Sequence, residues 1–164
     1  MLGRSAVFAA TFFIVSCATT PSVAPMKETF NPSDFAWSTA KGNSTIVGQA
    51  FMKTRGGDVK LAAGNVVRLV PVNAYTTELR VRRTINGEKV GSVDPRLEHY
   101  NRTTVADAGG NFEFKELPAG SWYVSCAITW EAANQTDMQK AGGIAYGTVT
   151  VAKGETKKVV VTRN

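Results

Sequence analysis

The stretch Trp122-Tyr123-Val124-Ser125-Cys126-Ala127-Ile128-Thr129-Trp130 decides the fold, because every second side chain in it is apolar. Successive side chains of a β-strand point to opposite faces. This alternation therefore predicts a strand with one face in a core and the other face turned away from it. Cys126 lies on the apolar face, so we expect it to behave as a small buried hydrophobe rather than as a reactive thiol.

Six further stretches of similar character surround this strand, separated by turn signals rich in glycine, proline and asparagine. They are Thr45–Met52, Val66–Val72, Arg102–Ala106, Phe112–Phe114, Ile144–Val151 and Lys158–Thr162. The last two are joined by Lys153-Gly154-Glu155, which predicts a hairpin. About seven short strands without a long helix are typical of an all-β sandwich.

Two sequence segments carry a family resemblance. Asp107–Phe114 (DAGGNFEF) and Leu117–Val124 (LPAGSWYV) together resemble the signature of carboxypeptidase regulatory-like domains, which are transthyretin-like or prealbumin-like sandwiches. Upstream, Gly48–Phe51 and Gly64–Pro71 are similar to the opening strands of that family. The resemblance implies a prealbumin-like (Ig-like Greek-key) β-sandwich over residues 44–164. It also implies a non-catalytic role, because such domains accompany enzymes rather than perform their chemistry.

The N-terminus has the organisation of an export signal. Arg4 precedes the apolar run Ala6–Val15, and Cys17 follows closely. That run is too short to span a bilayer core, which needs about 20 residues. The arrangement resembles bacterial lipoprotein signals, which implies a signal peptide over residues 1–16 and acylation of Cys17. An ordinary secretory signal and an uncleaved anchor remain the alternatives.

The residues after Cys17 bear on the location and mobility of the protein. Neither Ala18 nor Thr19 is the aspartate that marks inner-membrane retention in Gram-negative lipoproteins, so the resemblance implies a lipid anchor in the outer membrane with the domain facing the periplasm. Residues 17–43 are rich in Thr, Pro, Ser and Ala, which predicts a flexible tether. Its second half contains three aromatic side chains, and we expect that half to dock on the sandwich. These side chains are Phe30, Phe35 and Trp37.

The sequence offers little for catalysis or for cofactors. His99 is the only histidine, and the chain lacks a nucleophile elbow, a phosphate loop and metal-ligand spacing. The turn Asp107–Asn111 resembles part of a calcium loop but lacks the six to eight oxygens that calcium requires. We therefore expect no enzyme activity, no cofactor and no metal. Four acidic residues in the charged segment before and beside His99 are expected to form a solvated face; they are Glu78, Glu88, Asp94 and Glu98.

Residues 74–101 form an insertion that is less typical of the family and rich in arginine. Its first part, 73–84, is compatible with a capped helix or with a strand. Guanidinium groups bind carboxylate and phosphate well, so the candidate anion-binding or partner-binding residues are Arg80, Arg82, Arg83, Arg96 and Arg102. The alternative is a hydrophilic excursion kept soluble by its charge.

The charge and the export signal together limit the class of partner. The formal net charge of +6 suits contact with anionic surfaces, and an exported protein without a recognition motif is not expected to bind nucleic acid. We expect a lipid-anchored, non-enzymatic binding or scaffold module of the envelope, held to the membrane by acyl chains on Cys17. Its further partner would be an envelope protein or an anionic polymer. The alternatives are a structural subunit of a larger secretion or transfer assembly and, less favoured, a hydrolase centred on His99.

Overall fold

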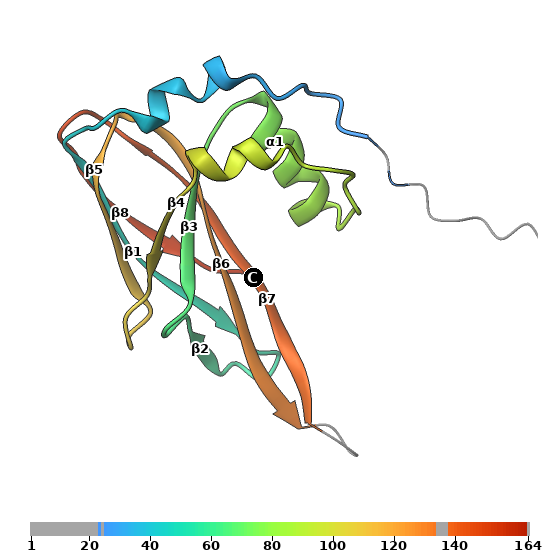
Figure 1. The fold of residues 1–164 in the computed structure, drawn as a ribbon. Helices are drawn as coiled ribbons and strands as arrows, with labels where there is room; N and C mark the ends of the chain where they lie inside the picture. Colours follow the sequence, from blue (N-terminus) through green and yellow to red (C-terminus); the bar gives the residue numbers. More distant parts are fainter. Residues whose placement is uncertain (1–22, 24, 134–137, 164) are drawn as a thin grey trace, which may run out of the picture.

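The structure, a computed structural model, describes residues 23, 25–133 and 138–163 and is an Ig-like, prealbumin-like β-sandwich (Figure 1). The strands are β1 (Ser44–Lys53), β2 (Val59–Leu61), β3 (Val66–Pro71), β4 (Arg102–Val105), β5 (Asn111–Leu117), β6 (Gly120–Ala133), β7 (Met138–Val151) and β8 (Thr156–Val161). One sheet has the order β2-β1-β5, with β8 also paired to β1, and the other has the order β4-β3-β6-β7. Residues 1–16, predicted to be a signal peptide, and Cys17 lie outside the described residues.

The core lies between the two sheets and is formed by the side chains that the alternation predicts. Trp122 is completely buried, and Cys126 is 1% exposed and is a free thiol. Burial of Cys126 raises the pKa of its thiol, which leaves it protonated and unreactive at neutral pH. Of the other positions on that face, Val124 and Ile128 are buried and Trp130 is partly buried, and Phe112, Phe114 and Val149 are buried as well.

The prediction that the last two strands form a hairpin is wrong. β7 pairs with β6, whereas β8 pairs in parallel with β1 in the opposite sheet, and the single bridge Tyr146–Thr162 joins β7 to the end of β8. The buried hydroxyl of Ser44 contacts the turn at which the chain crosses from one sheet to the other. It donates to the carbonyl of Ala152 (2.7 Å) and accepts from the amide of Gly154 (3.0 Å), which holds the turn against the start of β1. A short edge strand, β2, was also not expected from the sequence.

The turn between β4 and β5 is structural, as expected. Asp107 Oδ1 accepts hydrogen bonds from the amides of Gly109 and Asn111, both at 2.8 Å. Gly110 adopts φ +74°, and its carbonyl accepts from Ala50 of β1. Such a backbone angle favours glycine, which has no Cβ. The carboxylate is thus used inside the turn.

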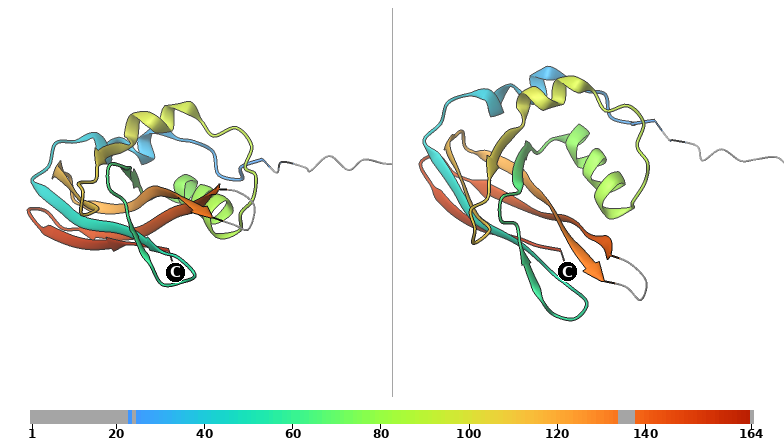
Figure 2. Two further views of the ribbon diagram at one scale, coloured as in Figure 1. Left: turned by 90° about the horizontal axis from the view of Figure 1, so that it is seen from below. Right: turned by 60° about the horizontal axis from the view of Figure 1, so that its bottom comes forward.

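The helical segments gather at one end of the sandwich, where the N-terminal segment crosses them (Figures 1 and 2). They are the 3₁₀ helices η1 (Pro32–Asp34), η2 (Ala36–Thr39) and η4 (Pro95–Tyr100), the α-helix α1 (Ala74–Arg80) and the π-helix η3 (Val81–Ile85). Phe30 and Phe35 of the N-terminal segment are buried with Tyr75 and Leu97 in a second, smaller core. The second half of the expected tether therefore docks, as its aromatic residues indicated.

Trp37 connects this second layer to the main core. Its ring lies against that of Trp122, with centroids 4.9 Å apart, and it packs on the edge of the main cluster. Within the described ranges, no helix has both the length and the apolarity to cross a membrane.

Candidate functional site

The insertion at 74–101 begins with a capped helix, which resolves the choice between helix and strand. Asn73 Oδ1 accepts from the amide of Thr76 (2.9 Å), and the Thr76 hydroxyl accepts from the amide of Asn73 (3.0 Å). This reciprocal capping satisfies two amides that a helix start otherwise leaves unpaired. α1 then continues directly into η3, where the amide of Asn86 donates to the carbonyl of Val81. Single π-turns of this kind are frequent at functional sites.

A cavity of about 380 Å³ lies between the insertion and the outer face of the β3-β6-β7 sheet. This volume falls within the usual range of about 300 to 1,000 Å³ for small-molecule sites. Three structural elements supply its walls. The residues from the sheet are Arg68, Val70, Tyr123, Ser125, Ile144 and Tyr146. Those from α1 and η3 are Thr76, Leu79, Arg80, Arg83 and Thr84. Those from the segment through η4 are Val93, Asp94, Pro95, Leu97, Glu98 and Asn101.

Arg80 and two tyrosines form the polar-aromatic side of this cavity. The guanidinium carbon of Arg80 lies 4.7 Å from the ring centroid of Tyr123 and 5.1 Å from that of Tyr146. The hydroxyl groups of Tyr123 and Thr77 are 2.9 Å apart and hydrogen-bonded, which ties β6 to α1. These contacts hold the helix above the sheet and fix the position of the Arg80 guanidinium at the cavity wall.

The acidic residues of the cavity already have basic partners. Both oxygens of Asp94 accept from Arg96, at 2.9 and 2.7 Å, and these hydrogen bonds lower the pKa of the Asp94 carboxyl. Glu98 accepts from Arg68 at 3.2 Å. No carboxylate among the described residues pairs with Arg80 or Arg83. The cavity therefore carries the positive charge of two arginines that its own acids do not balance.

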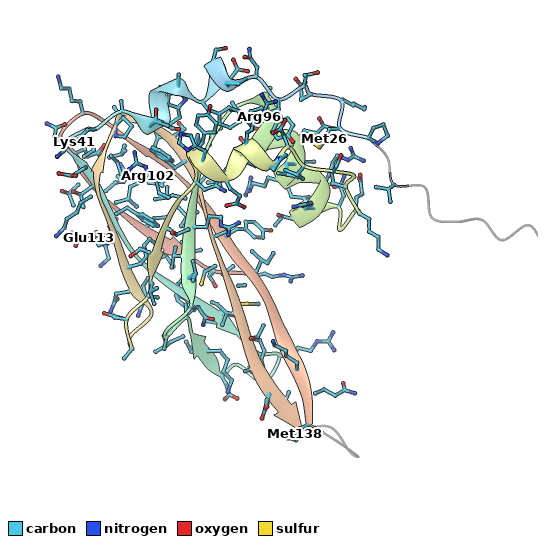
Figure 3. All side chains as sticks on the ribbon, viewed as in Figure 1. Met26, Lys41, Arg96, Arg102, Glu113 and Met138 are labelled. Atoms are coloured by element: carbon cyan, nitrogen blue, oxygen red, sulfur yellow. The ribbon has the colours of Figure 1, made fainter. Side chains whose placement is uncertain are left out.

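The structure divides the five candidate arginines into two groups. Arg80 and Arg83 line the cavity. Arg82 is buried and donates to Glu78, to Glu88 and to the carbonyl of Pro25. Arg96 lies over the ring of Phe30, beside the N-terminal segment that carries Met26 (Figure 3), and Arg102 donates to the carbonyl of Ser38.

The groups considered for catalysis do not assemble into an acid–base pair. His99 is exposed and contacts Tyr100 edge to face. Each of the four acids in this region bonds to an arginine; Glu78 and Glu88 share Arg82. Within the part of the chain that the structure describes, no group of three or more His, Cys, Asp or Glu side chains is arranged to hold a metal ion.

The cavity-lining residues outside the basic segment were not identified from the sequence. Tyr123 and Ser125 were placed on the face of β6 that points away from the core, and that alternation is the one signal that could have led to them. Tyr146 and Asn101 had no such signal, because the pairing of β7 with β6 and the position of η4 bring them to the site.

The fold has a clear counterpart among solved structures. A Pseudomonas aeruginosa protein, for which a carbohydrate-binding role has been suggested, superposes with a TM-score of 0.73 at 24% identity, covering 83% of this chain and 99% of that one. At this identity the likeness shows the fold alone. No protein-family model and no curated protein matches the chain.

Two more distant structures share only part of the arrangement. The major pilin subunit of Bacillus cereus matches with a TM-score of 0.39 at 13% identity, over 74% of this chain and 30% of the pilin. Chlorocatechol 1,2-dioxygenase from Pseudomonas putida matches with a TM-score of 0.30 at 13% identity, over 76% of this chain and 63% of the enzyme. Neither similarity is strong enough to support an argument about function.

Proposed function

We propose that this protein is a non-catalytic, saccharide-binding module of the bacterial cell envelope and that the cavity under the insertion is its binding site. The observation that carries the proposal is the cavity itself, which is enclosed by the helical insertion on one side and by the sheet on the other. Its lining combines apolar side chains with a few converging polar groups, the usual composition of a small-molecule site.

A saccharide suits this lining because a sugar ring has apolar C–H faces and a rim of hydroxyl groups. Val70, Leu79 and Ile144 supply apolar surface, while the hydroxyls of Ser125 and Tyr146 can both donate and accept. The suggested carbohydrate-binding role of the similar Pseudomonas aeruginosa protein supports the same class of ligand.

The membrane attachment and the domain family are parts of the same proposal. Acylation of Cys17 would place the sandwich at the periplasmic side of the outer membrane, where envelope saccharides are present. The segments Asp107–Phe114 and Leu117–Val124 support a carboxypeptidase regulatory-like domain, which in this setting would present its insertion to a ligand. As a non-catalytic module, the protein would hold or position the saccharide without cleaving it.

The test is isothermal titration of the full acylated chain, in detergent micelles, with soluble oligosaccharide fragments of envelope polysaccharides. Ser125→Trp would place a large ring in the cavity, whereas Thr129→Trp adds the same ring to the same outer face of β6 outside the cavity. We expect binding by the wild type and by Thr129→Trp, and its loss in Ser125→Trp. Binding by none of the three proteins, or equal binding by both variants, would contradict the proposal.

A further inference from the structure

We infer that the cavity recognises an acidic saccharide and that Arg80 and Arg83 bind its carboxylate. This inference rests on the proposed saccharide-binding function and specifies the class of sugar. It follows from the charge of the cavity, from the placement of the two arginines and from the polar atoms around them.

The charge balance of the cavity favours an anion. Asp94 and Glu98 are each neutralised by another arginine, at 2.7 and 3.2 Å respectively. Arg80 and Arg83 have no acidic partner among the described residues, so both cations face the cavity without compensation. A neutral sugar would leave that charge unbalanced, whereas one carboxylate offsets half of it within the site.

The placement of the two arginines suits a planar anion. They are three positions apart across the junction of α1 and η3, and both line the same cavity. Contact with Tyr123 and Tyr146 holds the Arg80 guanidinium in position, so little side-chain entropy remains to be lost on binding. A guanidinium group held in this way matches the two oxygens of a carboxylate in one plane.

Two further polar atoms at the cavity wall have no hydrogen-bond partner within the described part of the chain. Arg80 Nε is buried without an acceptor, and Asn101 Oδ1 is buried without a donor. Buried polar groups are normally paired. If Arg80 and Asn101 shift slightly around an acidic sugar, an oxygen of the sugar can accept from Arg80 Nε. A sugar hydroxyl can then donate to Asn101 Oδ1. A ligand with both groups on one ring, such as a uronic acid, satisfies both requirements.

The experiment compares three probes on the full acylated chain by isothermal titration. They are a linear tetrasaccharide of uronic acids, the neutral tetrasaccharide in which each carboxylate is replaced by a hydroxymethyl group, and the neutral tetrasaccharide carrying one phosphate. We expect the uronate to bind more tightly than either of the others. Arg80→Gln and Arg83→Gln should each weaken uronate binding by about tenfold or more, as expected for loss of a hydrogen bond to a charged group, and should weaken binding of the neutral probe by a smaller factor.

Arg55→Gln is the matched control, because it removes the same charge from an exposed turn outside this cavity. Arg83 is exposed and has no ion-pair partner among the described residues, so its variant tests the inference even if Arg80→Gln alters the packing of the tyrosines. Equal binding of the uronate and the neutral sugar would overturn the carboxylate assignment while preserving the proposed function. Tighter binding of the phosphorylated probe, or weakening by Arg55→Gln alone, would also overturn it. Absence of binding to every saccharide would overturn both.

Discussion

Glu78 and Arg82 form an ion pair one helical turn apart, with Nη1 and Oε1 at 3.3 Å, and both side chains bind the N-terminal segment. The Glu78 carboxylate accepts from the amides of Lys27 and Glu28, at 2.7 to 3.0 Å. Arg82 donates to the carbonyl of Pro25 at 2.7 Å. The pair therefore fastens the segment that follows the proposed lipid anchor to the helix that roofs the cavity.

The first prediction tests this attachment. Glu78→Gln should weaken the hydrogen bonds that the backbone amides of Lys27 and Glu28 donate to this side chain, because a neutral amide is a poorer acceptor than a carboxylate. Hydrogen exchange at Lys27 and Glu28 should become faster, while exchange in β6 stays slow. Glu28→Gln, which changes a neighbouring exposed carboxyl, is the control. Unchanged protection of the two amides in Glu78→Gln would show that the carboxylate does not hold the segment.

The second prediction concerns acid. Hydrogen bonds from the amides of Glu28 and Lys27, with help from Arg82, lower the pKa of the Glu78 carboxyl. A lowered pKa in the folded state means that the stabilisation is complete above the ordinary carboxyl pKa and is lost as the pH falls through the lowered value. The melting temperature of the wild type should therefore fall more than that of Glu78→Gln between pH 6 and about pH 3. If the melting temperatures of the wild type and Glu78→Gln fall in parallel with pH, the Glu78 carboxylate makes no such contribution to stability.

The third prediction concerns the main core. Truncation of Trp122 or Phe112 to alanine should lower the free energy of unfolding by about 3 to 5 kcal/mol, because each leaves a cavity between the sheets. Val105, which is 61% exposed, provides the contrast: its truncation should cost less than about 0.5 kcal/mol. Chemical denaturation followed by circular dichroism measures all three. Unaltered stability of both aromatic variants would refute their place in the core.

The fourth prediction uses the close contact between β6 and Trp37. A methyl group at Gly120 would overlap the Trp37 ring, so Gly120→Ala should push that ring off Trp122 and cost about 1 to 3 kcal/mol. Gly57→Ala is the matched control, because Gly57 also has a positive φ (+92°) but an added methyl there meets nothing within 4 Å. The fluorescence of the tryptophans and the melting temperature report the change. If Gly120→Ala has the same fluorescence and the same melting temperature as the control variant, the packing of Trp37 against Trp122 is contradicted.

The fifth prediction addresses the lipid anchor. Cys17→Ser should abolish labelling by a radioactive or clickable fatty acid and leave an unprocessed precursor in the membrane fraction, because the acylated side chain is removed. Cys126→Ser is the control, since the buried thiol cannot accept a lipid in the folded state. A mature wild-type chain that carries no lipid would refute the lipoprotein interpretation.

The elements that could be predicted from sequence are those whose signal is local. The alternation in 122–130 and the turn at Asp107–Asn111 each depend on neighbouring residues, and both have the predicted structure. β8 pairs with residues 45–50 of β1, more than a hundred positions earlier in the chain, so the local turn signal predicted the wrong partner strand. β2 is too short at three residues to show a period.

The site illustrates the same limit at the level of side chains. The sequence identified a cluster of arginines, but helical geometry separates Arg82 from Arg80 and Arg83, and ion pairing with Glu78 and Glu88 turns Arg82 into a structural residue. Charge density along the chain does not reveal which cations are already neutralised. Tyr146 reaches the cavity only because β7 lies beside β6.

The parallel pairing of β1 with β8 makes β1 depend on the described strand that is synthesised last. Until β8 emerges, one side of β1 has a row of amides and carbonyls without partners, and such an edge can recruit a strand from another molecule. Contacts between distant parts of a chain also form slowly. Newly made protein should therefore pass through an aggregation-prone interval, and premature termination before residue 156 should yield insoluble material even though most of the core sequence is present.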